Sequence, residues 1–353
     1  MALTSLKEYQ RKTADWRQLL RSNQRRTFLV ISVFILLYIA LGLVVDLFIY
    51  SEKYPQLPLS PIFYSILTWK FIPYATLITS VIAIISLWVT FRWYDKLMLL
   101  GTAYHEVTLE SAKTLPEKQL YNTVEEMQVA AGLRFMPRVF IIEADYMNAF
   151  ASGYSEKSAM IAITRGLLEK LNRAEIQAVM AHELSHIRHL DIRLTLMASV
   201  LANLMLIMID LLFYNIAFGR GRRSEREGGN WLVLVIIILR FVLPLLTVIL
   251  MLFLSRTREY MADAGSVELT RDNEPLAQAL LKIQGDYDAH QEKYAKAYHD
   301  TPHESIRREA YIFDPTTMGI GSKKSFSDLF STHPNIARRL EAIGFKRKDD
   351  QDD

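Results

Sequence analysis

The chain has 353 residues, contains no cysteine and carries a formal net charge of +3. Without cysteine it forms neither disulfides nor thiolate metal sites, so any metal must be held by His, Asp or Glu side chains. The small net charge gives no sign of a nucleic-acid-binding surface. Hydrophobic residues make up 51% of the chain and charged residues 22%, which predicts membrane segments combined with a separate polar domain.

Four long hydrophobic runs are expected to cross a membrane as helices. They comprise residues 27–50, 71–91, 194–218 and 231–254, and each reaches the ~20 residues that a helix needs to span the hydrocarbon core. Helices buried in a soluble core are the alternative, which these lengths disfavour. The first run follows a polar segment at residues 1–26 and lacks a small-residue cleavage site, so we interpret it as an anchor rather than a cleaved signal peptide.

Basic residues indicate the side of the membrane that each polar segment occupies. The segment before the first run is rich in Lys and Arg, whereas the loop after this run carries only Lys53 and Lys70. Because Lys and Arg are enriched on the cytoplasmic side, the N-terminal segment and residues 92–193 are expected in the cytoplasm. The loop between the third and fourth runs conflicts with this scheme, because parity places it outside although it carries Arg220, Arg222, Arg223 and Arg226. Either these arginines are translocated, or the last two runs form a hairpin that does not fully cross.

The segment NRAEIQAVMAHELSHIRHL, residues 172–190, has the hydrophobic spacing of an amphipathic helix, with Asn172 as its expected N-cap. Within it, His182 and His186 are four residues apart and therefore share one helix face, where both can bind one metal ion. Glu183 is offset by one position and can address a water molecule on that ion. In such an H-E-x-x-H arrangement zinc lowers the pKa of its water and the glutamate takes the proton. Two surface histidines on a helix are the alternative interpretation.

The third metal ligand is expected after the fourth hydrophobic run. His189 shares the face of His182, but seven helical residues rise about 10.5 Å, too far for both side chains to bind one ion. Glu259, in the segment SRTREYMADAG, supplies a carboxylate, and Asp263 follows one turn later on the same face. Because ligand histidines usually donate their second N–H to a carboxylate, Asp263 is a candidate for that role. Taken alone, the two acidic residues would equally suit a solvated face.

The two candidate ligand segments flank the last two hydrophobic runs. His186 lies eight residues before the third run and Glu259 five residues after the fourth, which corresponds to about 12 Å and about 7.5 Å of helix. Ligands of one ion must lie on one side of the membrane, and two crossings between them satisfy this condition. The zinc is therefore expected within roughly 10–15 Å of the membrane face.

Two charged residues inside the hydrophobic runs are expected to pair. Asp210 lies eight residues before Phe218, and Arg240 lies nine residues after Trp231, so an antiparallel hairpin places them at about the same depth. Charged side chains inside a membrane are costly and usually paired, which predicts an ion pair between these helices. The alternative is that each side chain faces a water-filled cavity or reaches back to the membrane surface.

In combination, these motifs resemble the HtpX-type bacterial membrane metalloproteases and, more distantly, the CAAX prenyl endopeptidases. The resemblance covers nearly the whole chain. It rests on HELSH with Asp191 shortly after it, on SRTREYMAD at residues 255–263, and on the four hydrophobic runs. MNAFASG at residues 147–153 and STHP at residues 331–334, followed by Arg339, match further motifs of the family. Prenyl endopeptidases have more membrane helices, so the HtpX branch is favoured.

The pattern and the resemblance together predict an α+β membrane protein. Its four hydrophobic helices carry a mostly helical, gluzincin-like catalytic domain with a small sheet, formed by residues 92–193 and 255–345. A helix is expected over residues 273–300 and a charged, disordered tail over residues 346–353. The resemblance implies one Zn2+ ion per chain, the lipid bilayer and protein or peptide substrates as partners, and proteolytic quality control at the bacterial inner membrane from the cytoplasmic side.

A small sheet is expected around the asparagine-alanine-phenylalanine segment. Residues 138–143 and 159–164 have the pattern of strands on either side of Asn148, Ala149 and Phe150. An exposed strand edge here would pair with the backbone of an extended substrate whatever its sequence. The alternative is that this segment only shapes a turn.

Two residues near the C-terminus receive a role from the resemblance alone. His333 and Arg339 are expected close to the zinc, where they would stabilise the oxyanion that forms on the attacked carbonyl group. Without the resemblance they would look like a surface pair.

Two other functions stay open at this level. A processing enzyme of the prenyl-endopeptidase kind would act on a defined C-terminal substrate. A membrane scaffold would keep the zinc for structure, although such sites fill all four positions with protein ligands, whereas this one leaves a position for water. Another divalent metal is also compatible with these ligands.

Overall fold

The computed structural model describes residues 6, 9–11, 16–99, 101–153, 155–218, 230–300, 311–313 and 333–347. The chain divides into two compact units, and each unit combines segments that are far apart in the sequence. The first unit comprises residues 1–27, 91–194 and 254–353; the second comprises residues 28–90 and 195–253.

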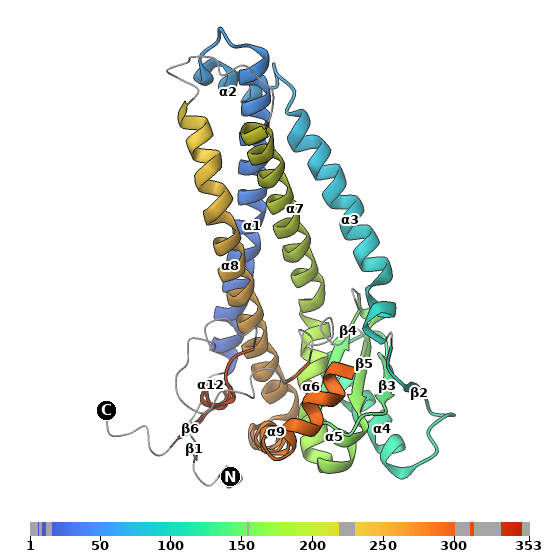
Figure 1. The fold of residues 1–353 in the computed structure, drawn as a ribbon. Helices are drawn as coiled ribbons and strands as arrows, with labels where there is room; N and C mark the ends of the chain where they lie inside the picture. Colours follow the sequence, from blue (N-terminus) through green and yellow to red (C-terminus); the bar gives the residue numbers. More distant parts are fainter. Residues whose placement is uncertain are drawn as a thin grey trace. The chain divides into compact units, whose positions relative to one another are not determined.

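Long hydrophobic helices dominate the second unit. In the described part of the chain, four of the helices that contribute to it contain a segment long and apolar enough to cross a membrane. They are α1 (Trp16–Lys53), α3 (Tyr74–Leu99), α7 (Asp191–Phe218) and α8 (Asn230–Thr270) (Figure 1). The four membrane helices expected from the sequence are confirmed. The arginine-rich loop that conflicts with the topology lies outside the described residues.

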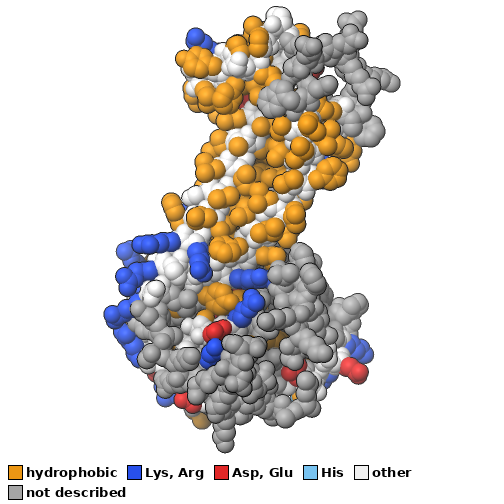
Figure 2. Space-filling view, turned by 90° about the vertical axis from the view of Figure 1, so that its left-hand side faces the viewer, with side chains coloured by type: hydrophobic (Ala, Val, Ile, Leu, Met, Phe, Trp, Pro, Cys, Tyr) orange, Lys and Arg blue, Asp and Glu red, His pale blue; other side chains and the backbone are white. Residues whose placement is uncertain are grey.

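The surface of the second unit is hydrophobic. Large side chains such as Phe28, Trp88 and Phe241 are more than half exposed, and Figure 2 shows many such side chains gathered on one face of the helices. A soluble monomer rarely exposes an apolar surface of this extent, whereas lipid covers it without cost. Between α1 and α3 in the sequence, the short helix α2 (Leu59–Leu67) buries Ile62 and Ile66.

Charged side chains within the hydrophobic helices have partners. Arg240 on α8 forms an ion pair with Asp210 on α7, so the pair predicted from their equal depths is present. Asp46 on α1 is buried and accepts hydrogen bonds from the backbone N–H groups of Ala75 (2.7 Å) and Thr76 (2.9 Å). These N–H groups belong to the first turn of α3, which has no partners for them within the helix. Both contacts join two helices through groups that would be costly if left alone in lipid.

The first unit contains a four-stranded mixed sheet with the strand order β2-β3-β5-β4. Its strands β3 and β5 are parallel, and the other two pairs are antiparallel. The strands predicted around the asparagine-alanine-phenylalanine segment are confirmed as β3 and β5, and β4 is an edge strand. The bounds are β2 (Tyr104–Val107), β3 (Arg138–Ile142), β4 (Ala149–Ser152) and β5 (Met160–Thr164), with the 3-10 helix η2 (Glu156–Ser158) between the last two.

A second sheet corrects one expectation about the C-terminal end. Strand β1 (Tyr9–Arg11) pairs antiparallel with β6 (Phe345–Arg347). The tail expected to be disordered from residue 346 is therefore ordered at its first two residues, because β1 supplies backbone hydrogen-bond partners. Residues 348–353 lie outside the described part.

Helices pack against the four-stranded sheet and share with it a common hydrophobic core, to which Phe140, Ile161, Val179 and Leu280 belong. The helix that carries HELSH, α6, packs against α4, α9 and β4 and is therefore fixed from several sides. The helix expected over residues 273–300 is confirmed as α9. The helices of this unit are α4 (Leu115–Ala131), α5 (Arg165–Lys170), α6 (Arg173–Arg188), α9 (Glu274–Asp300) and α12 (Ile336–Ala342).

Candidate metal centre and active site

The start of α6 is fixed by a reciprocal cap. The Asn172 side chain accepts a hydrogen bond from the Glu175 N–H (3.0 Å), and the Glu175 carboxylate accepts one from the Asn172 N–H (2.9 Å), which satisfies two N–H groups that the helix leaves unbonded. The N-cap predicted at Asn172 is thus confirmed. The helix then places His182 and His186 one turn apart on a buried face, with their Nε2 atoms 3.2 Å apart.

Glu259 on α8 completes a group of three ligand atoms. Its carboxylate oxygens lie 3.8 Å from Nε2 of His182 and 3.6 Å from Nε2 of His186, and all three donors lie within 4.8 Å of one another. Among the described residues this is the one cluster of His, Asp and Glu side chains with metal-binding geometry. Two imidazoles and one carboxylate, all largely buried, suit zinc with a fourth position open. His189 does not join them, because its Nδ1–H donates to the Ser185 carbonyl oxygen (2.8 Å).

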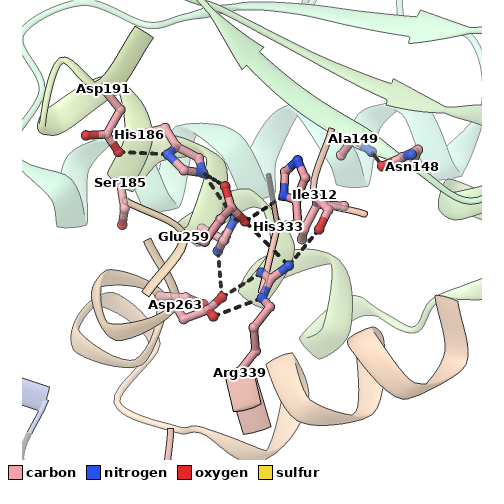
Figure 3. Close-up of polar contacts among 12 residues, drawn as sticks. Asn148, Ala149, Ser185, His186, Asp191, Glu259, Asp263, Ile312, His333 and Arg339 are labelled. Atoms are coloured by element: carbon pink, nitrogen blue, oxygen red, sulfur yellow. Dashed lines mark hydrogen bonds and ion pairs between the residues drawn. The ribbon is translucent and has the colours of Figure 1, made fainter. Parts of the chain in front are cut away.

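Behind each histidine stands a buried carboxylate (Figure 3). Nδ1 of His182 lies 3.0 Å from Oδ1 of Asp263, and Nδ1 of His186 lies 2.8 Å from Oδ2 of Asp191. With the Nδ1 protons donated to these carboxylates, both Nε2 lone pairs are directed to the metal position. Asp263 lies where its sequence position predicts. Asp191 had no predicted role, although it stands five residues after His186, where the chain turns from α6 into α7.

Arg339 and His333 both lie at this centre. The buried guanidinium of Arg339 donates to both carboxylate oxygens of Asp263 (2.9 Å and 2.7 Å) and to the carbonyl oxygen of Ile312 (2.6 Å). Its Nη1 also lies 3.5 Å from Oε2 of Glu259, and Nδ1 of His333 lies 3.4 Å from the same oxygen. Both residues therefore lie close to the candidate metal ligands, as predicted. The bidentate contact of Arg339 with Asp263, however, is the geometry of a residue that holds a carboxylate in place.

The two ligand-bearing helices approach each other closely because their facing residues are small. A Cβ atom at Gly265 of α8 would lie 2.3 Å from Oγ and 2.8 Å from Cβ of Ser185 on α6, so no larger residue fits without a shift. One residue further, the Ser266 hydroxyl donates to the Ala178 carbonyl oxygen (2.7 Å). Sequence reasoning missed this contact, although Gly265 and Ser266 follow Asp263 by only two and three residues in the sequence.

Burial and neighbouring charges shift the protonation of the central groups. Burial raises the pKa of Glu183 to about 8, and the nearby Glu259 carboxylate adds to this effect. Burial also lowers the pKa of His182, which favours the neutral form that binds metals. For His186 burial acts in the same direction, but the carboxylates of Asp191 and Glu259 outweigh it and raise the pKa. A bound cation would oppose the rise at Glu183.

The asparagine-alanine-phenylalanine segment lies in and next to the edge strand β4, and all three residues are buried. The Asn148 amide nitrogen donates to the Phe313 carbonyl oxygen (2.9 Å), and the Ile312 N–H donates to the Ala149 carbonyl oxygen (2.9 Å). Phe150 and Tyr311 form an antiparallel bridge. The expectation of an exposed strand edge is therefore wrong for these residues, because another segment of the chain supplies their backbone partners.

Comparison with known proteins agrees with this geometry. The sequence profile described as peptidase family M48 matches residues 114–345, which include both halves of the metal centre. The chain belongs to peptidase family M48. It is 33% identical over 329 residues to a "Protease HtpX homolog" of Helicobacter pylori (strain Shi470), an alignment that covers 93% of this chain and 98% of that protein. It is 37% identical over 265 residues to a "Protease HtpX homolog" of Listeria monocytogenes (serotype 4a, strain HCC23), covering 71% and 82%.

Among solved structures, the crystal structure of S. mikatae Ste24p aligns with a TM-score of 0.48 and 18% identity, over 95% of this chain and 67% of that chain. The resemblance to the HtpX-type proteases is confirmed by the profile and the curated relatives. With its four candidate membrane helices, this M48 chain is an integral metallopeptidase of a bacterial membrane.

Proposed function

We propose that this M48 chain is a zinc-dependent endopeptidase that hydrolyses peptide bonds in membrane or misfolded proteins. One observation carries the proposal: the buried ligand atoms of His182, His186 and Glu259 converge on one point, and Glu183 follows the first ligand directly. Three protein ligands leave the fourth position open, which favours a catalytic site over a structural one.

The residues around the metal position would hold it and set its geometry. His182 and His186 would bind through Nε2 and Glu259 through its carboxylate, while Asp263 and Asp191 keep each imidazole in the required tautomer. When bound, zinc supplies Lewis-acid charge and lowers the pKa of a water molecule to about 7.

Proton transfer is the task that we assign to Glu183. Among the described residues, its carboxylate oxygens are buried without a close hydrogen-bond partner, which leaves the carboxylate available to an incoming water. As the general base it would take the proton from that water and later give it to the nitrogen of the leaving amine.

Arg339 and His333 were both expected to stabilise the oxyanion, but we assign them different roles. Arg339 already donates to Asp263 and to a backbone carbonyl, so we assign it to positioning Asp263 and, through its charge, Glu259. His333 lies beside Glu259 and remains the candidate that would stabilise the oxyanion on the attacked carbonyl.

The side of the membrane follows from the basic residues of the sequence. The Lys- and Arg-rich N-terminal segment supports a cytoplasmic location for the catalytic residues, at the inner membrane of the bacterium. The two hydrophobic runs between His186 and Glu259 support the same location for both ligand segments. The partners that fit this arrangement are the lipid bilayer and extended stretches of polypeptide.

Paired measurements on the wild type and on Glu183→Gln test the proposal. Both proteins, purified in detergent, should bind one equivalent of zinc, and only the wild type should cleave an unfolded protein. Glu268→Gln is the matched control, because Glu268 is a partly exposed glutamate of α8 in a surface ion pair with Arg188; it should keep both properties. If the wild type binds zinc but does not cleave, this result would contradict the endopeptidase function and favour a membrane scaffold with a structural zinc. Cleavage restricted to prenylated C-terminal substrates would favour a processing enzyme.

A further inference from the structure

The segment Tyr311–Phe313, here named the strap, lies along the outer edge of β4. Ile312 donates its N–H to the Ala149 carbonyl oxygen (2.9 Å), and Tyr311 forms an antiparallel bridge with Phe150. On its other side β4 is paired with β5. The strap therefore extends the backbone pairing of the sheet beyond β4 by one β-bridge.

The edge that the strap occupies is the one that faces the catalytic glutamate. Backbone groups of alternate residues in a strand point to the same edge, so the Ala149 carbonyl and the Ala151 N–H share it. Helix α6, which carries Glu183, packs against β4, and the nearby Ala151 N–H favours the charged form of the Glu183 carboxylate. The strap backbone and the proposed general base thus lie along the same short stretch of β4.

A second contact ties the strap to the metal centre (Figure 3). Nη1 of Arg339 donates to the Ile312 carbonyl oxygen (2.6 Å) and lies 3.5 Å from Oε2 of Glu259. Both backbone polar groups of Ile312 are consequently bonded, the N–H to the edge strand and the carbonyl to an arginine next to a candidate metal ligand. An extended substrate crossing the site would offer the same two groups.

The strap is held by its side chains as well as by its backbone. Tyr311 and Ile312 are each 1% exposed. The Tyr311 hydroxyl lies 3.2 Å from that of Tyr146, and the Tyr311 ring meets the Phe150 ring edge-on at 5.7 Å. Side-chain contacts thus add to the backbone contacts that hold the strap on this edge.

We propose that the strap is an internal competitor, which pairs with β4 where a substrate backbone must pair and which has to leave before cleavage. This inference rests on the proposed endopeptidase function. It names the substrate class as extended, unfolded polypeptide, since only a free N–H and a free carbonyl on an extended backbone can replace the bonds of Ile312. Because the strap lowers the fraction of binding-competent protein, it raises KM and leaves kcat unchanged.

A reversible cross-link tests the competition directly. Phe150→Cys combined with Tyr311→Cys introduces the only two cysteines of a chain that has none. The hydrogen bond from Ile312 to Ala149 marks the bridged residues as a non-hydrogen-bonded pair, with Cα atoms roughly 4.5 Å apart, within the roughly 4.4–6.8 Å that a disulfide spans. The oxidised and reduced forms of the same preparation both lack the Phe150 and Tyr311 rings. A comparison of the two therefore measures the effect of the disulfide alone.

Binding and cleavage are then measured separately. A fluorescein-labelled unstructured peptide is titrated against the double-cysteine chain carrying Glu183→Gln, and cleavage of an unfolded protein is followed in the double-cysteine chain with Glu183 intact. The oxidised form should bind the peptide and cleave the protein at least tenfold less well than the reduced form. Equal binding in both forms would overturn the proposal.

Ile312→Pro has the opposite purpose to the disulfide: it weakens the attachment of the strap to β4. Proline removes the N–H that bonds Ala149, and Ile312→Val, which keeps it, is the matched control. The net contribution of one backbone hydrogen bond predicts a KM about three- to tenfold lower with kcat unchanged, and Ile312→Val should behave like the wild type. A lower kcat at unchanged KM would instead show that the strap is a fixed part of the site and would overturn the proposal.

The outcomes separate this inference from the proposed function. If the wild type binds zinc and cleaves no unfolded protein, the endopeptidase function fails, while the peptide-binding comparison still decides whether the strap competes for the edge. If the wild type cleaves and the oxidised form cleaves equally well, the function stands and the strap proposal fails.

Discussion

Replacing Asp263 by asparagine tests how the carboxylate that contacts His182 and Arg339 supports the candidate metal ligands. Oδ1 of Asp263 lies 3.0 Å from Nδ1 of His182 and 2.7 Å from Nη2 of Arg339, and Oδ2 lies 2.9 Å from Nε of Arg339. All three side chains are buried. The amide keeps one oxygen as an acceptor but removes the negative charge that faces the guanidinium and the imidazole.

The expected cost follows from this burial. Removing one partner of a buried ion pair typically destabilises a protein by 3–5 kcal/mol. Because Glu259 lies 3.5 Å from the same guanidinium and the amide oxygen still accepts one hydrogen bond, we expect the lower end, about 3 kcal/mol. Zinc affinity should fall by about 10–100-fold, since the imidazole of His182 loses the carboxylate that orients it.

Thermal unfolding of the metal-free protein and zinc competition with a chelating dye measure the two effects. Adding Arg339→Met removes the unpaired charge, so the double variant should recover most of the stability and little of the zinc affinity. Unchanged stability and zinc affinity in Asp263→Asn, or a double variant no more stable than the single one, would refute the reasoning.

Three further changes probe other parts of the structure by thermal unfolding. Gly265→Ala should cost about 1–3 kcal/mol by overpacking, and less in a Ser185→Gly background, because its Cβ would lie 2.3 Å from the Ser185 hydroxyl. Burial raises the pKa of Glu183 from 4.5 to about 8, so between these pH values the metal-free folded chain binds one proton that the unfolded chain has lost. The contribution of Glu183 to stability should therefore fall by roughly 1.4 kcal/mol per pH unit as pH rises towards 8, and Glu183→Gln should remove this contribution. In lipid nanodiscs, Arg240→Ala should destabilise the protein more than the double change with Asp210→Ala, since the single change leaves a carboxylate unpaired in the membrane.

The parts of the site that depend on spacing within one helix were predictable from the sequence. His182 and His186 share a face because they are four residues apart, and Asn172 caps that helix because its side chain reaches the N–H of the third helical residue. The pairing of Asp210 with Arg240 was predictable for a related reason: two helices of known length joined by one loop fix which depths face each other.

Contacts between distant segments were not predictable in the same way. Arg339 lies 76 residues from Asp263 in the sequence, and no local pattern distinguishes an arginine that holds a buried carboxylate from one that faces solvent. The pairing of the strap with Ala149 and Phe150 was not predictable for a similar reason, because an edge strand and a paired strand have the same alternation of side chains. Only the folded chain shows which backbone meets the open edge.

The arrangement of α8 explains why the metal ligand and its supporting carboxylate act together. Glu259 and Asp263 are one helical turn apart on the same face, so any rotation of α8 about its axis withdraws both from the histidines of α6 at once. The contact of Gly265 with Ser185 resists this rotation, because the backbone of α8 has no side chain there to rearrange. Loss of the metal and separation of the two helices should therefore occur as one event, since the proposed zinc ligand Glu259 and the residues that hold the helices together lie within two turns of the same helix.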